Sequence, residues 1–401
     1  MNSVQFDFDS VLILADESAD WNVAGLRQLD RLALALNEFA EATRPGARID
    51  IFIWWKPAIP AELRRAREHR RLSGIAIAEG ISHEHANRPV VLMTRLLPAR
   101  RGLAQFLADA ERTHVDPGID DAAAWSRLAA DLQAACRSVP ERETKDRWRY
   151  LAEKNQIAEC ERWLLQRSCK RDDGLVSRYL NRPLSRAVSR VLVKTHLTPN
   201  GWTLFILVFP VAACVFLSRG TYAGFVIGAV LYQLHSILDG CDGEIARAKY
   251  LDSKKGPGVD ALGDLIGLLL FTLGLGLGLF QMTSAPALRW VFLGESILSF
   301  GLIANRLGRH TLDLLERGPA AVLSSEHDQL LRESGKRFFG SRLTSLLFNM
   351  TKRDVVYFAF LILAIFGLAR WILHLLFVYS LGSSLLVSKG RRMRRAGGGS
   401  T

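Results

Sequence analysis

Residues 238–267 read LDGCDGEIARAKYLDSKKGPGVDALGDLIG and lie between two long apolar segments of a 401-residue chain. Within them, Asp239 and Asp242 are three residues apart, and Asp260 and Asp264 are four apart. On α-helices these spacings put the members of each pair on one face. A hairpin of two helices can turn both faces toward each other, which would gather four carboxylates beside the membrane surface.

Four carboxylates this close together predict a metal site. Ionised carboxylates in or beside lipid are costly, and neighbouring like charges add to that cost unless a cation compensates them. Ligation by oxygen alone favours a hard divalent ion, so we expect Mg²⁺ or Mn²⁺, as two ions bridged by shared carboxylates. Two such ions would neutralise a diphosphate and stabilise a departing oxygen, while a carboxylate left partly free could take a proton from an attacking hydroxyl.

The small and basic residues of the same stretch fit a phosphate-bearing ligand. Gly243 and Ala246 leave space for a flat base or a sugar, and Gly256 lets the connecting backbone bend close to a ligand. Arg247 offers a planar, permanently charged fork to phosphate oxygens. The alternative interpretation is that the aspartates are helix caps and loop charges, with Arg247 paired to Glu244 on the surface.

The stretch matches the pattern D-x-x-D-G-x-x-A-R-x8-G-x3-D-x3-D at every specified position, and in this it resembles the CDP-alcohol phosphotransferase (CDP-alcohol phosphatidyltransferase) family. The resemblance implies that a substituted phosphate group is transferred from a CDP-alcohol to an acceptor alcohol, with release of CMP. It also implies roles for the matching residues: Asp239, Asp242 and Asp260 as metal ligands, Asp264 as general base and further ligand, and Gly243, Ala246, Arg247 and Gly256 at the cytidine diphosphate.

The apolar segments predict an all-α transmembrane domain. A spanning helix needs about 20 mostly apolar residues, and six segments approach that length: 200–218, 221–240, 260–282, 288–306, 354–370 and 371–388. The basic tail after residue 388 should be cytosolic by the positive-inside rule, and an even number of spans puts the N-terminus on the same side. Six helices and a cytosol-facing site are also the layout of the resembled family, so we expect a multi-pass protein of the inner (plasma) membrane.

The charge of the chain favours membrane and phosphate partners. The formal net charge is +12, and much of the positive charge lies in clusters beside the apolar segments, which suits anionic headgroups better than nucleic acid. We therefore expect membrane lipids, a CDP-alcohol donor and an alcohol acceptor as partners, no nucleic acid, and we leave a homodimer open. Arg306, Lys352 and Arg353 lie at span ends, where they could hold a phosphate of the acceptor or serve only as topology signals.

Two helices are predicted ahead of the first span. The segment from about Asp146 to Cys169 is charged and lacks helix breakers, so it is expected to form a connecting helix. The next segment combines apolar residues at helical spacing with a basic residue every fourth position, at Arg182, Arg186, Arg190 and Lys194. This pattern predicts an amphipathic helix in the membrane interface, with its basic face toward headgroups or phosphate; a helix packed on the soluble domain is the alternative.

The N-terminal part is predicted to be an α/β domain. Short apolar runs at 11–15, 49–55, 74–78 and 90–93 alternate with helical segments, which indicates a largely parallel sheet. Together with the junction residues 173–174, 178–183 and 197–200, this resembles bifunctional inositol-phosphate cytidylyltransferase / di-inositol-phosphate synthase fusions, whose Rossmann-like nucleotidyltransferase domain makes the CDP-alcohol that the second domain consumes. The expected divisions are 1–140 (α/β domain), 141–198 (connecting and interfacial helices), 199–390 (transmembrane domain) and 391–401 (basic flexible tail).

The α/β domain departs from that group where a nucleotide would bind. A nucleotidyltransferase of this kind needs a glycine-rich loop with a basic residue after its first strand, so that backbone N–H groups can cradle the triphosphate. Here Ala15–Asn22 contains neither glycine nor Lys or Arg, and its acidic residues would repel phosphate. The strand ending at Leu92–Thr94 lacks the expected metal-binding Asp. We predict a degenerate, inactive cytidylyltransferase-like domain that is kept for binding or scaffolding.

The sequence leaves the substrates open. A lipid donor such as CDP-diacylglycerol would make the chain a phospholipid synthase, whereas CDP-inositol would make it a di-inositol-phosphate synthase. The alternatives from other classes are a membrane cation transporter and an inactive scaffold. Transport predicts acidic residues at mid-membrane depth on several spans, whereas here four lie at the ends of two neighbouring spans.

Overall fold

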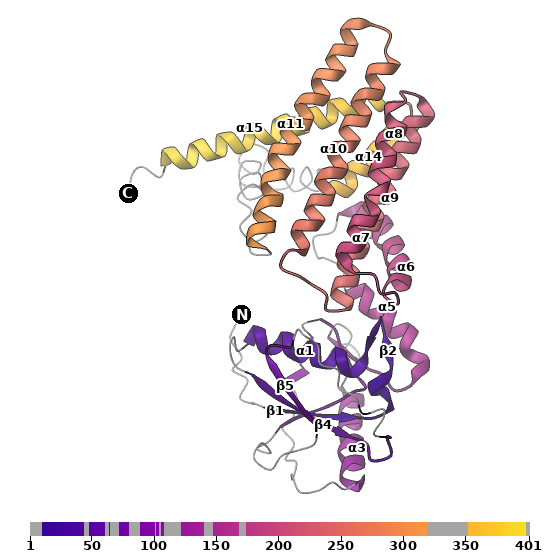
Figure 1. The fold of residues 1–401 in the computed structure, drawn as a ribbon, viewed down its shortest axis with the longest axis vertical. Coiled ribbons are helices and arrows are strands. Elements are labelled where there is room, and N and C mark those ends of the chain that lie inside the picture. Colours follow the sequence, from indigo (N-terminus) through magenta and orange to yellow (C-terminus); the bar gives the residue numbers. More distant parts are fainter. Residues whose placement is uncertain are drawn as a thin grey trace. The chain divides into compact units, whose positions relative to one another are not determined.

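The computed structural model describes residues 10–43, 48–60, 64, 72–79, 89–100, 102–103, 106–107, 122–139, 147–167, 174–318 and 352–397. The chain divides into two compact units, and Figure 1 labels many of their helices and strands. The α/β unit comprises residues 1–168 with 193–195 and 247–250, and the helical unit comprises 169–192, 196–246 and 251–401. The boundary predicted at residue 140 therefore lies inside the α/β unit.

The α/β unit is built on a four-stranded parallel sheet. Its strand order is β5 (Ile75–Glu79), β4 (Ile49–Trp55), β1 (Ser10–Ala15) and β6 (Val90–Met93). All four strands match the apolar runs in the sequence, so the predicted parallel sheet is confirmed. The order of the strands reverses at β1, between β4 on one side and β6 on the other.

Both faces of the sheet are covered, which is why its strands are apolar at consecutive positions rather than at alternate ones. Val11 and Ile13 of β1 belong to the core cluster that includes α1 (Gln28–Thr43). Leu12 and Leu14 belong to a second cluster, on the other face, together with Trp125 of α3 (Ala122–Ser138). The helix predicted between the first two strands is therefore present as α1.

Shorter elements complete the α/β unit: η1 (Glu17–Asp20), the hairpin of β2 (Asn22–Val23) and β3 (Leu26–Arg27), the pair β7 (Leu96–Pro98) and β8 (Trp148–Tyr150), η4 (Lys154–Gln156) and α5 (Ile157–Arg167). The helix predicted over residues 146–169 is wrong in its first half. Residues 148–150 pair antiparallel with β7, and the side chain of Trp148 is buried in the core. The α-helix begins at Ile157.

The helical unit contains η5 (Ser177–Asn181), which is a π-helical turn, α6 (Arg182–Leu192), α7 (Pro199–Ile206), α8 (Val208–Ser218), α9 (Tyr222–Ala248), α10 (Gly256–Met282), α11 (Pro286–Arg317), α14 (Arg353–Ile365) and α15 (Ala369–Gly397). Within the part of the chain that the structure describes, four stretches are long and apolar enough to cross a membrane: 199–218, 222–248, 256–282 and 286–317. The count of six spans stays a prediction. The tail expected to be flexible from residue 391 continues as helix to Gly397.

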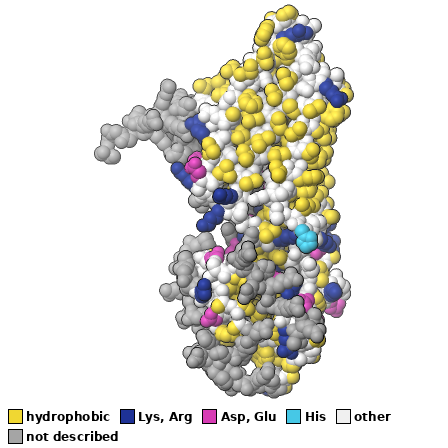
Figure 2. Space-filling view, viewed as in Figure 1, with side chains coloured by type: hydrophobic (Ala, Val, Ile, Leu, Met, Phe, Trp, Pro, Cys, Tyr) yellow, Lys and Arg dark blue, Asp and Glu magenta, His cyan; other side chains and the backbone are white. Residues whose placement is uncertain are grey.

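The outer surface of these helices is apolar. Leu204 of α7 is 71% exposed and Trp290 of α11 is 68% exposed. Figure 2 shows hydrophobic side chains over much of the visible face of the helical unit. Inside the unit, a Cβ atom at Gly278 of α10 would overlap with the carbonyl oxygen of Leu217 of α8, so glycine permits a close helix–helix approach. An apolar exterior around closely packed helices fits lipid as the surrounding solvent.

The predicted amphipathic helix is present as α6, and its buried side differs from the expectation. Leu184 and Val191 are exposed, which leaves an apolar face available to the membrane. Ser185 and Ser189 are buried instead. Arg182, expected on the basic face, is also buried, because its guanidinium lies 3.2 Å from the carboxylate of Glu244 on α9.

Candidate functional site

Three of the four aspartates singled out in the sequence lie together. Asp239 comes from the C-terminal half of α9, and Asp260 and Asp264 come from the first turns of α10. Each offers a carboxylate oxygen, and the three oxygens lie within 4.8 Å of one another. Asp260 and Asp264 can both face α9 because four residues correspond to little more than one helical turn. All three side chains are partly buried.

Asp242 lies beside this group and has its own contacts. The hydroxyl of Thr203, on α7, donates a hydrogen bond of 2.7 Å to Asp242 Oδ2, and the Gly243 backbone N–H donates to Oδ1. A three-residue step on an α-helix turns a side chain about 60° away from its partner. Asp242 is therefore rotated from Asp239 toward α7. Thr203 was missed from the sequence, because a threonine in an apolar span carries no motif.

A basic residue from the far end of the chain completes the group. Arg353, the first residue of α14, forms an ion pair with Asp264. Arg306, which was considered for the same phosphate-binding role, donates a hydrogen bond of 2.9 Å to Ser383 on α15. Lys352 is the N-cap residue of α14. Among the described contacts of the three basic residues suggested for an acceptor phosphate, that of Arg353 reaches the aspartate group.

The residues predicted for the cytidine diphosphate lie on the same two helices. Gly243 and Ala246 are on α9, close in sequence to Asp242, and Gly256 is the first residue of α10. Arg247 is in the last turn of α9, in a segment that belongs to the α/β unit. The alternative interpretation placed Glu244 on the surface, as the partner of Arg247. The side chain of Glu244 is instead 0% exposed and accepts hydrogen bonds from residues of α6.

The donor set of the aspartate group fits a hard divalent cation. Every ligand is a carboxylate oxygen, and the group lies on helices whose remaining residues are largely apolar. Oxygen ligands in a partly buried setting suit Mg²⁺ or Mn²⁺ rather than a soft metal. Asp239, Asp260 and Asp264 would hold such an ion directly.

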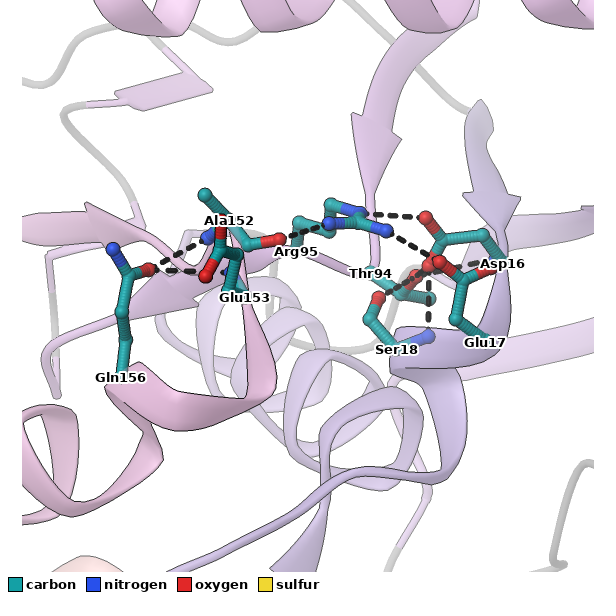
Figure 3. A network of polar contacts seen from close by, with 8 residues as sticks. All are labelled: Asp16, Glu17, Ser18, Thr94, Arg95, Ala152, Glu153 and Gln156. Atoms are coloured by element: carbon teal, nitrogen blue, oxygen red, sulfur yellow. Dashed lines mark hydrogen bonds and ion pairs between the residues drawn. The ribbon is translucent and has the colours of Figure 1, made fainter.

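In the α/β unit, an arginine of the unit itself occupies part of the place where an open parallel sheet usually binds a ligand, beside a cavity of about 650 Å³ that Asp16 and Glu17 help to line. Ligands of such sheets bind beyond the carboxyl ends of the strands, where the strand order reverses. Here Arg95, just after β6, forms ion pairs of 2.6 Å with Asp16 and 2.7 Å with Glu17, just after β1. Figure 3 shows this guanidinium between the carboxylates of Asp16 and Glu17 on one side and the backbone oxygen of Ala152, to which it donates a further hydrogen bond, on the other.

The contacts of Asp16 stabilise its ionised form. Burial raises the pKa of Asp16, but hydrogen bonds from Ser18 and Arg95 outweigh burial and leave the pKa below the ordinary value of 3.8. Burial lowers the pKa of Arg95, whereas its hydrogen bond to Asp16 raises it, and the net direction is upward. The Thr94 hydroxyl lies 2.7 Å from that of Ser18. The guanidinium of Arg95 thus balances the negative charge of the loop that carries Asp16 and Glu17.

Comparisons with known proteins concern mainly the helical unit. Residues 196–311 match the family model described as CDP-alcohol phosphatidyltransferase. A protein of Archaeoglobus fulgidus described as "Bifunctional IPC transferase and DIPP synthase" is 35% identical over 154 residues, which are 38% of this chain and 30% of the relative. Proteins with the same description from Thermococcus kodakarensis and Aquifex aeolicus are 37% identical over 118 residues and 32% identical over 140 residues. These matches cover 29% and 35% of this chain, and 26% and 31% of the two relatives, so the chain spans about a third or less of each relative.

Proposed function

We propose that this chain, whose residues 196–311 carry a CDP-alcohol phosphatidyltransferase domain, transfers a substituted phosphate group from a CDP-alcohol to an acceptor alcohol and releases CMP. The observation that supports this most directly is the convergence of Asp239, Asp260 and Asp264 within 4.8 Å, from two adjoining apolar helices. We place the reaction at the membrane, with the chain as a multi-pass protein.

The aspartates bind the cations, and divalent ions held there would supply charge neutralisation for the diphosphate and the departing CMP. Asp264 accepts the proton of the acceptor hydroxyl as its oxygen attacks the phosphorus distal to cytidine. The new O–P bond forms, the bond to CMP breaks, and CMP leaves with the bonding electrons. Arg353, which contacts Asp264, would hold a phosphate of the acceptor near the attacking oxygen.

Among donors, CDP-inositol is favoured over CDP-diacylglycerol. The curated relatives that match this chain are described as IPC transferase and DIPP synthase, which are terms of inositol-phosphate chemistry. The ion pairs of Arg95 with Asp16 and Glu17 further support an α/β unit without cytidylyltransferase activity. The CDP-alcohol would then come from a separate enzyme.

The test is CMP release by the purified full-length chain in detergent with Mg²⁺. The donors would be CDP-inositol and CDP-diacylglycerol, and the acceptors inositol phosphate and inositol. We expect CMP release with CDP-inositol and none after addition of EDTA. Turnover with CDP-diacylglycerol alone would move the assignment to phospholipid synthesis. Folded protein without turnover of any donor would favour a transporter or a scaffold instead.

A matched pair of variants connects turnover to the aspartate group. Asp264→Asn removes the proposed base and keeps the size of the side chain. Asp313→Asn makes the same chemical change at an exposed position of α11. We expect the first variant to lower the rate of CMP release by about 10²- to 10⁴-fold, the usual contribution of a general base, and the second to retain the rate.

A further inference from the structure

The first two residues of α14 contact two different parts of the helical unit. Arg353 forms the ion pair with Asp264 on α10. Asp354, its neighbour in the chain, accepts a hydrogen bond of 2.6 Å from the backbone N–H of Ser177 through Oδ2. Ser177 lies in the first turns of the continuous helix, residues 175–192, that runs through η5 into α6. One short segment of backbone thus connects the aspartate group with the start of that helix.

The contact of Asp354 satisfies a group that the helix itself leaves without a partner. The first backbone N–H groups of a helix have no carbonyl within the helix, and a carboxylate there is also favoured by the helix dipole. At the preceding turn, a Cβ atom at Gly174 would overlap with the Asp354 carboxylate. Glycine at this position therefore permits the approach of α14.

The helix that Asp354 caps is fixed to α9 by polar contacts. Asn181 accepts a hydrogen bond of 3.0 Å from Gln233. The next residue, Arg182, lies 3.2 Å from the buried carboxylate of Glu244, and one turn later the Ser185 hydroxyl donates to the same carboxylate at 2.9 Å. α9 also carries Asp239. The start of α14 is therefore held to both helices that supply the aspartates. It contacts α10 through Arg353, and it is connected to α9 through Asp354 and the η5–α6 helix.

We infer that Asp354 is a positioning residue, which fixes the first turn of α14 to the η5–α6 helix so that the Arg353 guanidinium stays at Asp264. Two effects follow from that placement. A fixed positive charge beside Asp264 weakens the binding of divalent cations to the aspartates, because like charges repel. The second effect rests on the proposed function: the same guanidinium is positioned to bind the acceptor's phosphate.

The first readout is the affinity for Mn²⁺ without substrates, measured on the full chain in detergent by electron paramagnetic resonance. Asp354→Ala should free Arg353 and tighten Mn²⁺ binding by about 2- to 10-fold, the lower part of the range for residues in contact. Arg353→Gln should have an effect of the same sign. The double variant should bind Mn²⁺ no more tightly than Arg353→Gln alone, because Asp354 acts through Arg353.

Gly174→Ala gives an independent variant, since it displaces the Asp354 carboxylate without changing any charge. It should also tighten Mn²⁺ binding, and thermal unfolding in detergent would verify that each variant is folded. Asp313→Asn on α11 is the control, and it should leave Mn²⁺ affinity unchanged. Additive effects of Asp354→Ala and Arg353→Gln, or unchanged Mn²⁺ affinity in folded Asp354→Ala and Gly174→Ala, would overturn the inference.

A kinetic readout separates this inference from the proposed function. In a chain that releases CMP, Asp354→Ala should raise the KM of a phosphorylated acceptor and leave the KM of the CDP-alcohol nearly unchanged. An unaltered acceptor KM counts against the positioning role while the transferase assignment stands. If no donor is turned over, the Mn²⁺ cycle still decides whether Asp354 positions Arg353.

Discussion

Replacing Asp260 by asparagine should stabilise the metal-free protein and destabilise the metal-loaded protein relative to the unchanged chain. Asp260 has the carboxylates of Asp239 and Asp264 within 4.8 Å. Two unit charges at that separation repel by about 0.9 kcal/mol at the dielectric constant of water and by about 3.5 kcal/mol at an effective constant of 20. The group is partly buried, and Arg353 offsets the charge of Asp264, so relief of roughly 1–3 kcal/mol is expected.

The assay is thermal unfolding of the full chain in detergent, followed by tryptophan fluorescence with either EDTA or saturating Mg²⁺. With EDTA, Asp260→Asn should raise the midpoint by roughly 2–10 °C, since 1 kcal/mol corresponds to a few degrees in a domain of this size. An ion at 1,000 times its dissociation constant stabilises the folded state by about 4.1 kcal/mol, which exceeds the expected relief of repulsion. The unchanged chain should gain that amount, and the variant, with one ligand fewer, should gain little, so the order of the two midpoints reverses.

Asp313→Asn, at an exposed position of α11, is the control for loss of a carboxylate. It should change neither midpoint by more than a degree or two, because surface substitutions usually stay within about 0.5 kcal/mol. A lower midpoint of Asp260→Asn in EDTA, together with an equal rise of both midpoints in Mg²⁺, would contradict this prediction. That result would mean that the three carboxylates neither repel one another nor share a cation.

Three further predictions concern the proposed base, the acidic loop and a buried arginine. Asp264→Asn should lower kcat for CMP release by about 10²- to 10⁴-fold, the usual contribution of a general base, with a smaller change in the donor KM. The pKa of Asp16 is lower in the folded state, so its ionised carboxylate stabilises the fold at pH values above the ordinary 3.8, and this contribution is lost as the pH falls through the folded-state pKa. Asp16→Asn should therefore make the unfolding midpoint depend less on pH in the acid range. Arg31 is 1% exposed and donates hydrogen bonds of 2.8 Å and 2.6 Å to the carbonyls of Ala248 and Val23. Arg31→Met should lower the free energy of unfolding by about 1–3 kcal/mol for each carbonyl left without a donor, and with it the unfolding midpoint. Arg127→Met, on the exposed side of α3, should leave both unchanged.

The parts of the fold that could be predicted from sequence depend on local periodicity. The parallel strands follow from short apolar runs, because a sheet covered on both faces requires apolar residues at every position. The approach of Asp239 to Asp260 and Asp264 follows from helical spacing and from the short connection between α9 and α10. In each case, residues close in sequence carry the information.

The parts that could not be predicted depend on partners distant in sequence. Residues 148–150 form a strand because β7, some fifty residues earlier, offers a free edge, whereas their own composition is compatible with a helix. Asp242 meets Thr203, and Asp264 meets Arg353, across separations that no spacing rule covers. The four-residue spacing of Arg182 from Arg186 predicts a side chain on the basic surface of the helix. Arg182 is buried instead, because it forms an ion pair with the buried Glu244.

The internal ion pairs of the α/β unit bear on how this unit meets small molecules in the cell. Arg95 belongs to the chain, so Asp16 and Glu17 meet its guanidinium at an effective concentration in about the millimolar range or above. A freely diffusing cation at micromolar abundance competes poorly against a tethered one. The ion pairs of Asp16 and Glu17 with Arg95 are therefore expected to persist in the presence of such a cation.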